Sequence, residues 1–507
     1  MCVESVRDVV VVWPEVQDFW PCRRGRVRGD SGEMEQLTAL DATFLEVEDS
    51  DPHVSLAVGG VSIIEGPAPS YDEFVSTFAK RVPTIPRCRQ VLRTHPLDLG
   101  PPEWVDDPHF DVSRHLHRVA LPHPGDDTEL FQMIATVMER RLDRERPLWE
   151  CWIIEGLSDD RWAVLTKIHH CIADGIATTQ MLGKFSDNGG DDSFATDIRA
   201  AKEPDRLGFS LAKVNLNPLS WVSAIARSAF AAMATAEHVA VGAAELTASL
   251  LSPAPESSLN GPVTTMRRYS AARVRLGDLQ AVAQVFGVTL NDVALAAITD
   301  GYRRILLDRG EQPGHNSLRT LVPVSVRSVN HFNMTDNQVS AMLPLLPVDE
   351  ADPVRQLQLV HSRLMRAKAS GQREGGSAAV SAAKNVPFAF SAWTIRLMSR
   401  LPQRAVVALA TNVPGPRGQQ TLMGRRVLEI LPVPPIALQL RTGIAMLSYA
   451  DNFIFGITAD YDTAPDIEAL SAGIEKGVAR LVAASLARRH RRGSPRRESK
   501  EVAPLVR

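Results

Sequence analysis

Two apolar segments separated by a short acidic turn constrain the fold more than any other stretch of this sequence. Residues 150–157 and 162–169 carry the β-branched and aromatic residues that favour strands, and Ser158, Asp159 and Asp160 lie between them. This pattern predicts an antiparallel hairpin. Its second strand runs directly into two adjacent histidines, His169 and His170.

The two histidines open the segment His169-His170-Cys171-Ile172-Ala173-Asp174-Gly175. Side chains alternate between the two faces of a strand. If the strand persists through the pair, the two imidazoles point in opposite directions, and at most one of them is the working base. Asp174 is placed to cap a helix predicted at 175–185, and Gly175 allows a sharp turn.

Several interpretations of this segment compete. A structural histidine pair at a strand end is the plainest. A metal site needs at least three convergent ligands, and the sequence indicates no third ligand nearby. A serine hydrolase needs its nucleophile on a Gly-x-Ser-x-Gly elbow, which the sequence lacks. The side chain of Cys171 is expected to point away from its neighbours and to serve packing.

A general base is the remaining interpretation. Histidine is the side chain whose ordinary pKa lies nearest neutrality, and at a strand end its ring can take a proton from a hydroxyl or a thiol. Asp174 would fix the loop, either by capping the following helix or by pairing with an arginine.

Composition narrows the class of protein. Of the 507 residues, 44% are hydrophobic and 23% charged, as in a globular protein, and the net charge of -3 argues against nucleic-acid binding. The five cysteines include no CxxC pair, which argues against a disulfide framework and a zinc site. No window approaches the roughly 18–20 apolar residues of a membrane span, and acidic residues precede the apolar run at 9–13, unlike a signal peptide. We therefore expect a cytoplasmic protein that is not secreted.

Pattern and composition along the chain predict an α/β fold with mixed sheets in two halves. The expected divisions are a disordered extension at 1–33, a first lobe at 34–192, a helical connector at 193–262, a second lobe at 263–487 and a basic, disordered tail at 488–507. Further strands are expected at 54–64, 267–274, 318–326, 339–346, 427–431, 440–448 and 453–458. Helices are expected at 71–82, 126–142, 276–286, 290–307, 353–370 and 466–486.

The segment from His169 to Gly175 resembles the HHxxxDG motif of the chloramphenicol-acetyltransferase-like superfamily. The wider sequence resembles one branch, the bacterial wax ester synthase/diacylglycerol acyltransferase family of actinobacterial type. The resemblance covers about 34–470 and rests on further motifs in the family's order: Leu37-Thr38-Ala39-Leu40-Asp41-Ala42-Thr43-Phe44, Pro147-Leu148-Trp149, Asn260-Gly261-Pro262, Asn291-Asp292-Val293, Pro323-Val324-Ser325-Val326-Arg327 and Asn412-Val413-Pro414-Gly415-Pro416.

This resemblance implies two chloramphenicol-acetyltransferase-like lobes with an active-site tunnel between them. It implies acyl transfer from a fatty acyl-CoA to diacylglycerol or a long-chain alcohol, without a metal, a further cofactor or a covalent enzyme intermediate. Acyl-CoA is then a substrate. His170 would be the general base, His169 would support it, and Asp174 would have a structural role.

The other motif residues have open roles. Asn291 and Asp292 either line the site or cap a helix, Pro147, Leu148 and Trp149 are expected to position the hairpin, and the motif at 412–416 is expected to shape the interface between the lobes. The basic tail and N-terminal arm are either attracted to anionic lipid surfaces or simply solvated.

Alternative functions also stay open. They are a same-fold acyltransferase with another hydroxyl acceptor, a membrane glycerolipid acyltransferase suggested by the bare His-x4-Asp spacing of His169 and Asp174, and a non-catalytic lipid-binding homologue.

Overall fold

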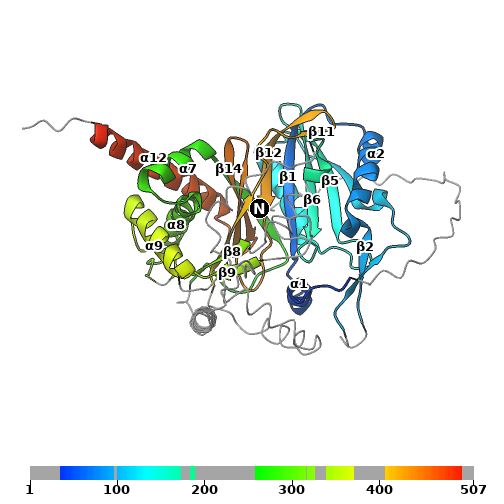
Figure 1. The fold of residues 1–507 in the computed structure, drawn as a ribbon, viewed down its shortest axis with the longest axis horizontal. Coiled ribbons are helices and arrows are strands. Elements are labelled where there is room, and N and C mark those ends of the chain that lie inside the picture. Colours follow the sequence, from blue (N-terminus) through cyan, green and yellow to red (C-terminus); the bar gives the residue numbers. More distant parts are fainter. Residues whose placement is uncertain are drawn as a thin grey trace, which may run out of the picture.

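The computed structural model describes residues 35–95, 100–172, 183–188, 257–315, 317–325, 339–369 and 406–493. Asp174, Gly175, the N-terminal extension and most of the expected connector at 193–262 lie outside these ranges. In the described part, two six-stranded sheets lie side by side, with helices on their outer sides (Figure 1).

The first sheet contains the predicted hairpin. Its strand order is β11-β12-β1-β6-β5-β4, with bounds Thr421–Leu422, Arg425–Val433, Ala57–Glu65, Arg161–His169, Trp149–Leu157 and Leu116–Ala120. Strands β5 and β6 pair antiparallel, as the sequence predicts, and β1 pairs antiparallel with the other side of β6. The strand that ends in His169 therefore lies in the interior of the sheet.

Two strands from the C-terminal half complete the first sheet. Strand β12 pairs antiparallel with β1, placing Val61 opposite Leu431, and β11 pairs with β12. The expected second lobe at 263–487 thus contributes strands to the sheet of the first. An exposed edge of β1 would present unpaired backbone groups, and β12 covers that edge.

The second sheet has the order β7-β14-β13-β10-β8-β9. Its strands are Arg267–Arg275, Asn452–Asp460, Thr442–Tyr449, Ala408–Pro414, Thr320–Ser325 and Val339–Met342. Helices α7 (Leu276–Phe286), α8 (Leu290–Asp308), α9 (Pro353–Ala369) and α12 (Ile467–Gly493) lie on its outer side (Figure 1). Most of these elements lie within a few residues of the predicted positions.

In the N-terminal half, the described residues include the α-helices α1 (Ala39–Ser50), α2 (Tyr71–Arg81) and α3 (Asp127–Glu139). A small sheet of β2 (Gln90–Arg93) and β3 (Glu103–Asp106) lies at the side of the first sheet. Short polar side chains fix where the helices begin: Ser70 accepts the backbone N–H of Glu73 at the start of α2, and a capping box opens α3.

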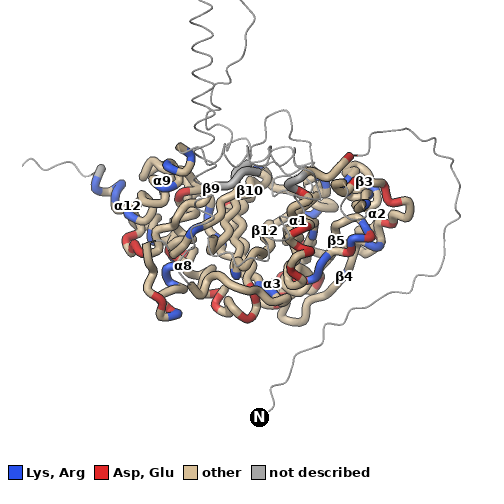
Figure 2. The backbone as a smooth tube through the Cα atoms, turned by 90° about the horizontal axis from the view of Figure 1, so that it is seen from below, with Lys and Arg blue, Asp and Glu red and all other residues tan. Residues whose placement is uncertain are grey.

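The C-terminal boundary differs from the prediction. Helix α12 continues to Gly493, so residues 488–493 are helical and do not belong to a disordered tail. The guanidinium of Arg488 lies 5.1 Å from the ring centroid of Phe286 on α7, and this cation–π contact ties the last turns of α12 to the body. Figure 2 shows basic residues gathered along this outer end of α12.

One apolar cluster joins the two sheets, because it contains the core of the first sheet together with residues of β7, β13 and β14. Phe131 of α3 meets Tyr269 of β7 edge-on, with ring centroids 5.2 Å apart, and the Tyr269 hydroxyl donates to the Pro432 carbonyl of β12 at 3.0 Å. Arg273 of β7 joins Asp127 of α3 and Glu429 of β12 in a charged bridge. These contacts fix the halves against each other.

Among the described residues, no single helix has the length and apolar character to cross a membrane. Helices α7 and α8 are long and apolar enough for a membrane span only when they are taken together, and the angle between them is 104°.

Candidate active site

His169 is the last residue of β6, and its side chain is 1% exposed. The backbone N–H of Cys171 donates to Nδ1 at 3.2 Å, and Nε2 lies 3.3 Å from Oε2 of Glu48. Because Nδ1 accepts, the ring proton is on Nε2 and is donated to the carboxylate. Both ring nitrogens of His169 are therefore occupied within the protein.

Glu48, near the end of α1, is the centre of this network. Its side chain is 1% exposed; it accepts the backbone N–H of Leu56 at 2.9 Å and a guanidinium N–H of Arg144 at 2.7 Å. Burial alone would raise the pKa of Glu48, but the hydrogen bonds from His169, Leu56 and Arg144 outweigh it and lower the pKa to about 2. Glu48 is an anion that fixes the orientation of His169.

His170 follows the end of the strand and is half-buried. Its ring stacks on Phe44 of α1, with centroids 4.0 Å apart and planes 16° apart, and its backbone N–H donates to the Leu56 carbonyl at 3.0 Å. Phe44 packs against a small cluster drawn from both halves of the chain: Val47, Val54, Leu56, Val263, Ile436 and Ala437. His170 is thereby placed where the two halves meet.

The condition for oppositely directed imidazoles is not met, because β6 ends at His169 and His170 lies in a turn. Both rings reach α1, His169 through Glu48 and His170 through Phe44. They still differ in environment, since one is enclosed and fully bonded and the other is half-buried against an aromatic ring. The prediction of unequal roles is therefore retained on different grounds.

Sequence reasoning missed Phe44 and Glu48 as site residues. They are four residues apart and so lie on the same face of α1, which is the face that meets both histidines. The sequence feature that could have indicated them is an aromatic residue four positions before an acid. Phe44 also ends the family-like motif that begins at Leu37.

Family models match most of the chain. The wax ester synthase/diacylglycerol acyltransferase catalytic domain matches residues 37–294, and the C-terminal domain of the same family matches 335–481. A protein named probable diacylglycerol O-acyltransferase tgs1, from Mycobacterium tuberculosis, is 54% identical over 463 residues, which are 91% of this chain and 99% of that protein.

The chain belongs to the wax ester synthase/diacylglycerol acyltransferase family.

Solved structures agree on the fold. The wax ester synthase/diacylglycerol acyltransferase from Marinobacter aquaeolei VT8 superposes with a TM-score of 0.63 at 24% identity, covering 89% of this chain and all (100%) of that one. The first condensation domain of the calcium-dependent antibiotic synthetase gives a TM-score of 0.58 at 13% identity, covering 90% and 97%. The predicted two-lobed fold of chloramphenicol-acetyltransferase type is confirmed.

The family's Pro-Leu-Trp segment lies against the histidine strand. The carbonyl of Leu148 accepts the backbone N–H of His169 at 3.0 Å. Trp149 is buried, donates its indole N–H to the Cys88 carbonyl at 2.9 Å and stacks on His115 with centroids 4.7 Å apart. These contacts hold Leu148 and Trp149 beside the hairpin, and the positioning role of Pro147, Leu148 and Trp149 stays a prediction.

Cys171 is 2% exposed within the apolar core, and burial raises the pKa of its thiol well above the ordinary value. A neutral, enclosed thiol is a poor nucleophile, as expected for a packing residue. No group of three or more His, Cys, Asp or Glu side chains in the described ranges is arranged to hold a metal ion.

The Asn291-Asp292 pair lies in the second half, at the start of α8. Asp292 caps the helix, because its carboxylate accepts the backbone N–H of Thr289 at 2.8 Å and also lies 2.8 Å from Nδ1 of His361. The amide nitrogen of Asn412 on β10 lies 3.5 Å from the side-chain oxygen of Asn291. The pair thus joins α8 to helix α9 and to strand β10.

Proposed function

We propose that this chain transfers a fatty acyl group from acyl-CoA to diacylglycerol, giving triacylglycerol, with His170 as the general base. Membership of the family and the name of the relative at 54% identity support this reaction. The structural observation that carries the role of His170 is its position: half-buried, stacked on Phe44 at the meeting of the two halves, beside a fully bonded His169.

In the proposed reaction, neutral His170 removes the proton from the acceptor hydroxyl. The oxygen attacks the thioester carbonyl carbon, the tetrahedral intermediate collapses, and the carbon–sulfur bond breaks. The departing thiolate takes the proton back from His170, so the enzyme returns to its starting state. A positioned general base of this kind contributes about 10²- to 10⁴-fold to the rate, and alignment of the two bound substrates supplies much of the rest.

The neighbouring residues hold this base in place. The Glu48–His169 hydrogen bond fixes the end of β6 and hence the turn that carries His170. Phe44 presents its ring face to His170, and an aromatic face stabilises the positive charge that His170 carries between the two proton transfers. We propose a positioning role for His169 and Glu48. Asp174 and Gly175 keep their expected loop-fixing roles as proposals, since they lie outside the described residues.

We propose that long-chain alcohols are a second class of acceptor, giving wax esters, and that the protein works in the cytoplasm in peripheral contact with a membrane or lipid-droplet surface. Both substrates carry lipid chains, and the exposed Arg489 and Arg491 at the end of α12 would favour an anionic surface. Binding to anionic but not neutral vesicles in a flotation assay would support this contact; equal behaviour with both would contradict it.

The test of the main proposal compares the purified chain with His170→Ala. Labelled palmitoyl-CoA is supplied with diacylglycerol, a long-chain alcohol and water-soluble alcohols. We expect labelled triacylglycerol from the unmodified chain and at least a ~10²-fold loss in the variant. His109→Ala, an exposed histidine, is the matched control. Equal product from His170→Ala would remove His170 as the base. If the unmodified chain gives no product with any of the acceptors, a lipid-binding protein is favoured.

A further inference from the structure

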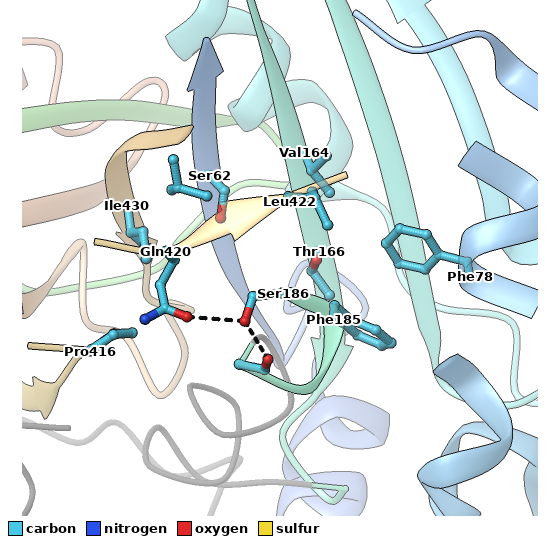
Figure 3. Close-up of a pocket in the computed structure, with 12 residues that line it drawn as sticks. Ser62, Phe78, Val164, Thr166, Phe185, Ser186, Pro416, Gln420, Leu422 and Ile430 are labelled. Carbon is cyan, nitrogen blue, oxygen red and sulfur yellow. Dashed lines mark hydrogen bonds between the residues drawn. The ribbon is translucent and has the colours of Figure 1, made fainter. Parts of the chain in front are cut away.

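A pocket lies on the first sheet, and neither histidine of the proposed site lines it (Figure 3). Its lining comes from strands of both halves, from α2, from the segment 183–186 and from the segment 416–420: Ser62, Phe78, Val164, Thr166, Gly183, Phe185, Ser186, Pro416, Gln420, Leu422, Val427 and Ile430. Pro416 ends the family motif that begins at Asn412, so this motif contributes a residue to the lining of the pocket.

The floor of the pocket is a row across three strands. Ser62 of β1 is opposite Val164 of β6 and opposite Ile430 of β12. Directly opposed residues of antiparallel strands present their side chains to the same face, so these three share one surface. Figure 3 shows Phe78 and Phe185 on one side of this floor and Pro416 and Gln420 on the other.

Aromatic rings back one wall. The ring centroids of Phe74 and Phe78 are 4.5 Å apart, those of Phe78 and Phe185 are 5.0 Å apart, and Trp149 lies 6.5 Å from Phe185. Trp149 of the Pro-Leu-Trp motif therefore supports the pocket wall as well as the hairpin.

The segment 183–188, which carries Phe185, is fastened at both sides of the pocket. Arg81 of α2 donates to the Phe185 carbonyl and pairs with the Asp187 carboxylate. Asp187 also accepts the backbone N–H of Met423 at 3.1 Å and of Gly424 at 2.8 Å. The wall is thus held by bonds to both halves of the chain.

The chemistry of the lining favours an apolar occupant. None of the described residues that line the pocket is charged. The Ser186 hydroxyl bonds to the Gln420 side-chain oxygen at 3.0 Å, and the Gln420 amide nitrogen donates to the Gly418 carbonyl at 3.1 Å. These polar groups are already paired with protein partners, so the pocket offers mainly hydrocarbon surface.

Two of the pocket's lining residues lie close to His170 along the chain. Val164 and Thr166 are on β6, six and four residues before His170. With a rise of about 3.3 Å per residue, Val164 is at most about 20 Å from His170 and Thr166 at most about 13 Å. A lipid chain spans about 15 Å, half of a bilayer's hydrocarbon core of about 30 Å. Gly60, which pairs with Thr166, adds no side chain beside it.

We propose that this pocket holds the far end of a long alkyl chain of a substrate whose reacting group lies at His170, and that it sets the preferred chain length. This inference rests on the proposed function. The chain is either the acyl chain of the donor or a chain of the lipid acceptor, which have the same chemistry.

The test changes the depth of the pocket in the full chain. Ser62→Phe, at a half-buried floor position, shortens it, and Ile430→Ala lengthens it. In one arm, kcat/KM is measured for octanoyl-CoA and palmitoyl-CoA with one diacylglycerol. In the other arm, the donor is fixed and the diacylglycerol carries octanoyl or palmitoyl chains. Ser76→Phe, on the exposed side of α2, adds the same ring outside the pocket.

We expect Ser62→Phe to lower the palmitoyl-to-octanoyl ratio of kcat/KM by at least ~10-fold, which corresponds to the exclusion of about two buried methylene groups. Ile430→Ala should shift the preference towards longer chains, and Ser76→Phe should match the unmodified chain. A shift in the donor arm identifies the acyl chain as the occupant, and a shift in the acceptor arm identifies the lipid acceptor. Unchanged ratios in both arms for both variants would overturn the proposal.

A binding measurement separates this inference from the reaction itself. Palmitoyl-CoA with a photoreactive group at the end of its chain should cross-link to peptides containing Val164 or Ile430, and it should do so in His170→Ala as well. Cross-links confined to other peptides, together with unchanged ratios in the acceptor arm, would contradict the pocket assignment. Failure of His170→Ala to lose activity would contradict the proposed base and leave the pocket assignment standing.

Discussion

The two faces of β6 differ in how far their side chains are hydrogen-bonded within the protein. On one face, Lys167 and His169 are buried and bonded: the Lys167 ammonium donates to the Val137 carbonyl at 2.8 Å and to that of Arg140 at the end of α3, and His169 meets Glu48. Burial lowers the pKa of Lys167 to about 8. The other face carries Val164, Thr166 and Ile168, and the first two of these line the pocket.

This difference separates support from substrate contact within one strand. Charged and polar groups can be buried at low cost only when they are paired or hydrogen-bonded, so the bonds of Lys167 and His169 hold β6 against α3 and α1. The other face has no charged side chain among Val164, Thr166 and Ile168, and its part in the pocket suits it to bind a chain. Changes on the first face should alter stability and turnover for all substrates alike, whereas changes on the second should alter chain-length selectivity.

The largest expected effect on the first face is on acid stability. The pKa of Glu48 is about 2 in the folded chain against an ordinary value of 4.5. A lowered folded pKa means that the stabilisation is complete above pH 4.5 and is lost as the pH falls towards 2. The unmodified chain should lose on the order of 3 kcal/mol more free energy of unfolding over this window than Glu48→Gln. Urea denaturation at a series of pH values measures this; parallel curves would contradict it.

The second largest effect is expected on the turnover of Glu48→Gln. Glu48→Gln weakens the partner that orients His169, and removal of such an orienting partner from histidines that bind metals costs about 10- to 100-fold. We expect kcat to fall by that range, KM to change little, and the palmitoyl-to-octanoyl ratio to stay constant. Glu468→Gln, the same change at an exposed acid of α12, is the control. A changed chain-length ratio in Glu48→Gln would break the distinction between the two faces.

The smallest effect is expected at Phe44, which contacts the base without belonging to either face. Phe44→Leu keeps an apolar side chain but removes the ring stacked on His170. Aromatic pairs contribute about 0.5–1.5 kcal/mol beyond the burial of their area, so kcat/KM should fall roughly 2- to 10-fold for both donor lengths. Steady-state kinetics with octanoyl-CoA and palmitoyl-CoA would show it, and an unchanged kcat/KM would mean that the stack does not contribute.

Much of the secondary structure could be predicted because it depends on neighbours in the sequence. The hairpin of β5 and β6, helix α7 and the start of α2 follow from hydrophobic periodicity and capping residues. The capping box of Thr289 and Asp292 is equally local. The end of α12 was placed too early because a run of arginines suggests solvation, whereas Phe286 lies within reach of Arg488.

The sequence by itself determined the strand that ends in the histidine pair, the motif that marks the family, and the choice of histidine as the group able to move a proton. The tertiary structure decided which histidine is braced, because Glu48 lies 121 positions from His169 in the chain. It also decided that β12 completes the first sheet and that Ser62, Val164 and Ile430 form one floor. Local periodicity specifies which face of an element is apolar, but the partner of that face depends on packing between segments far apart in the chain.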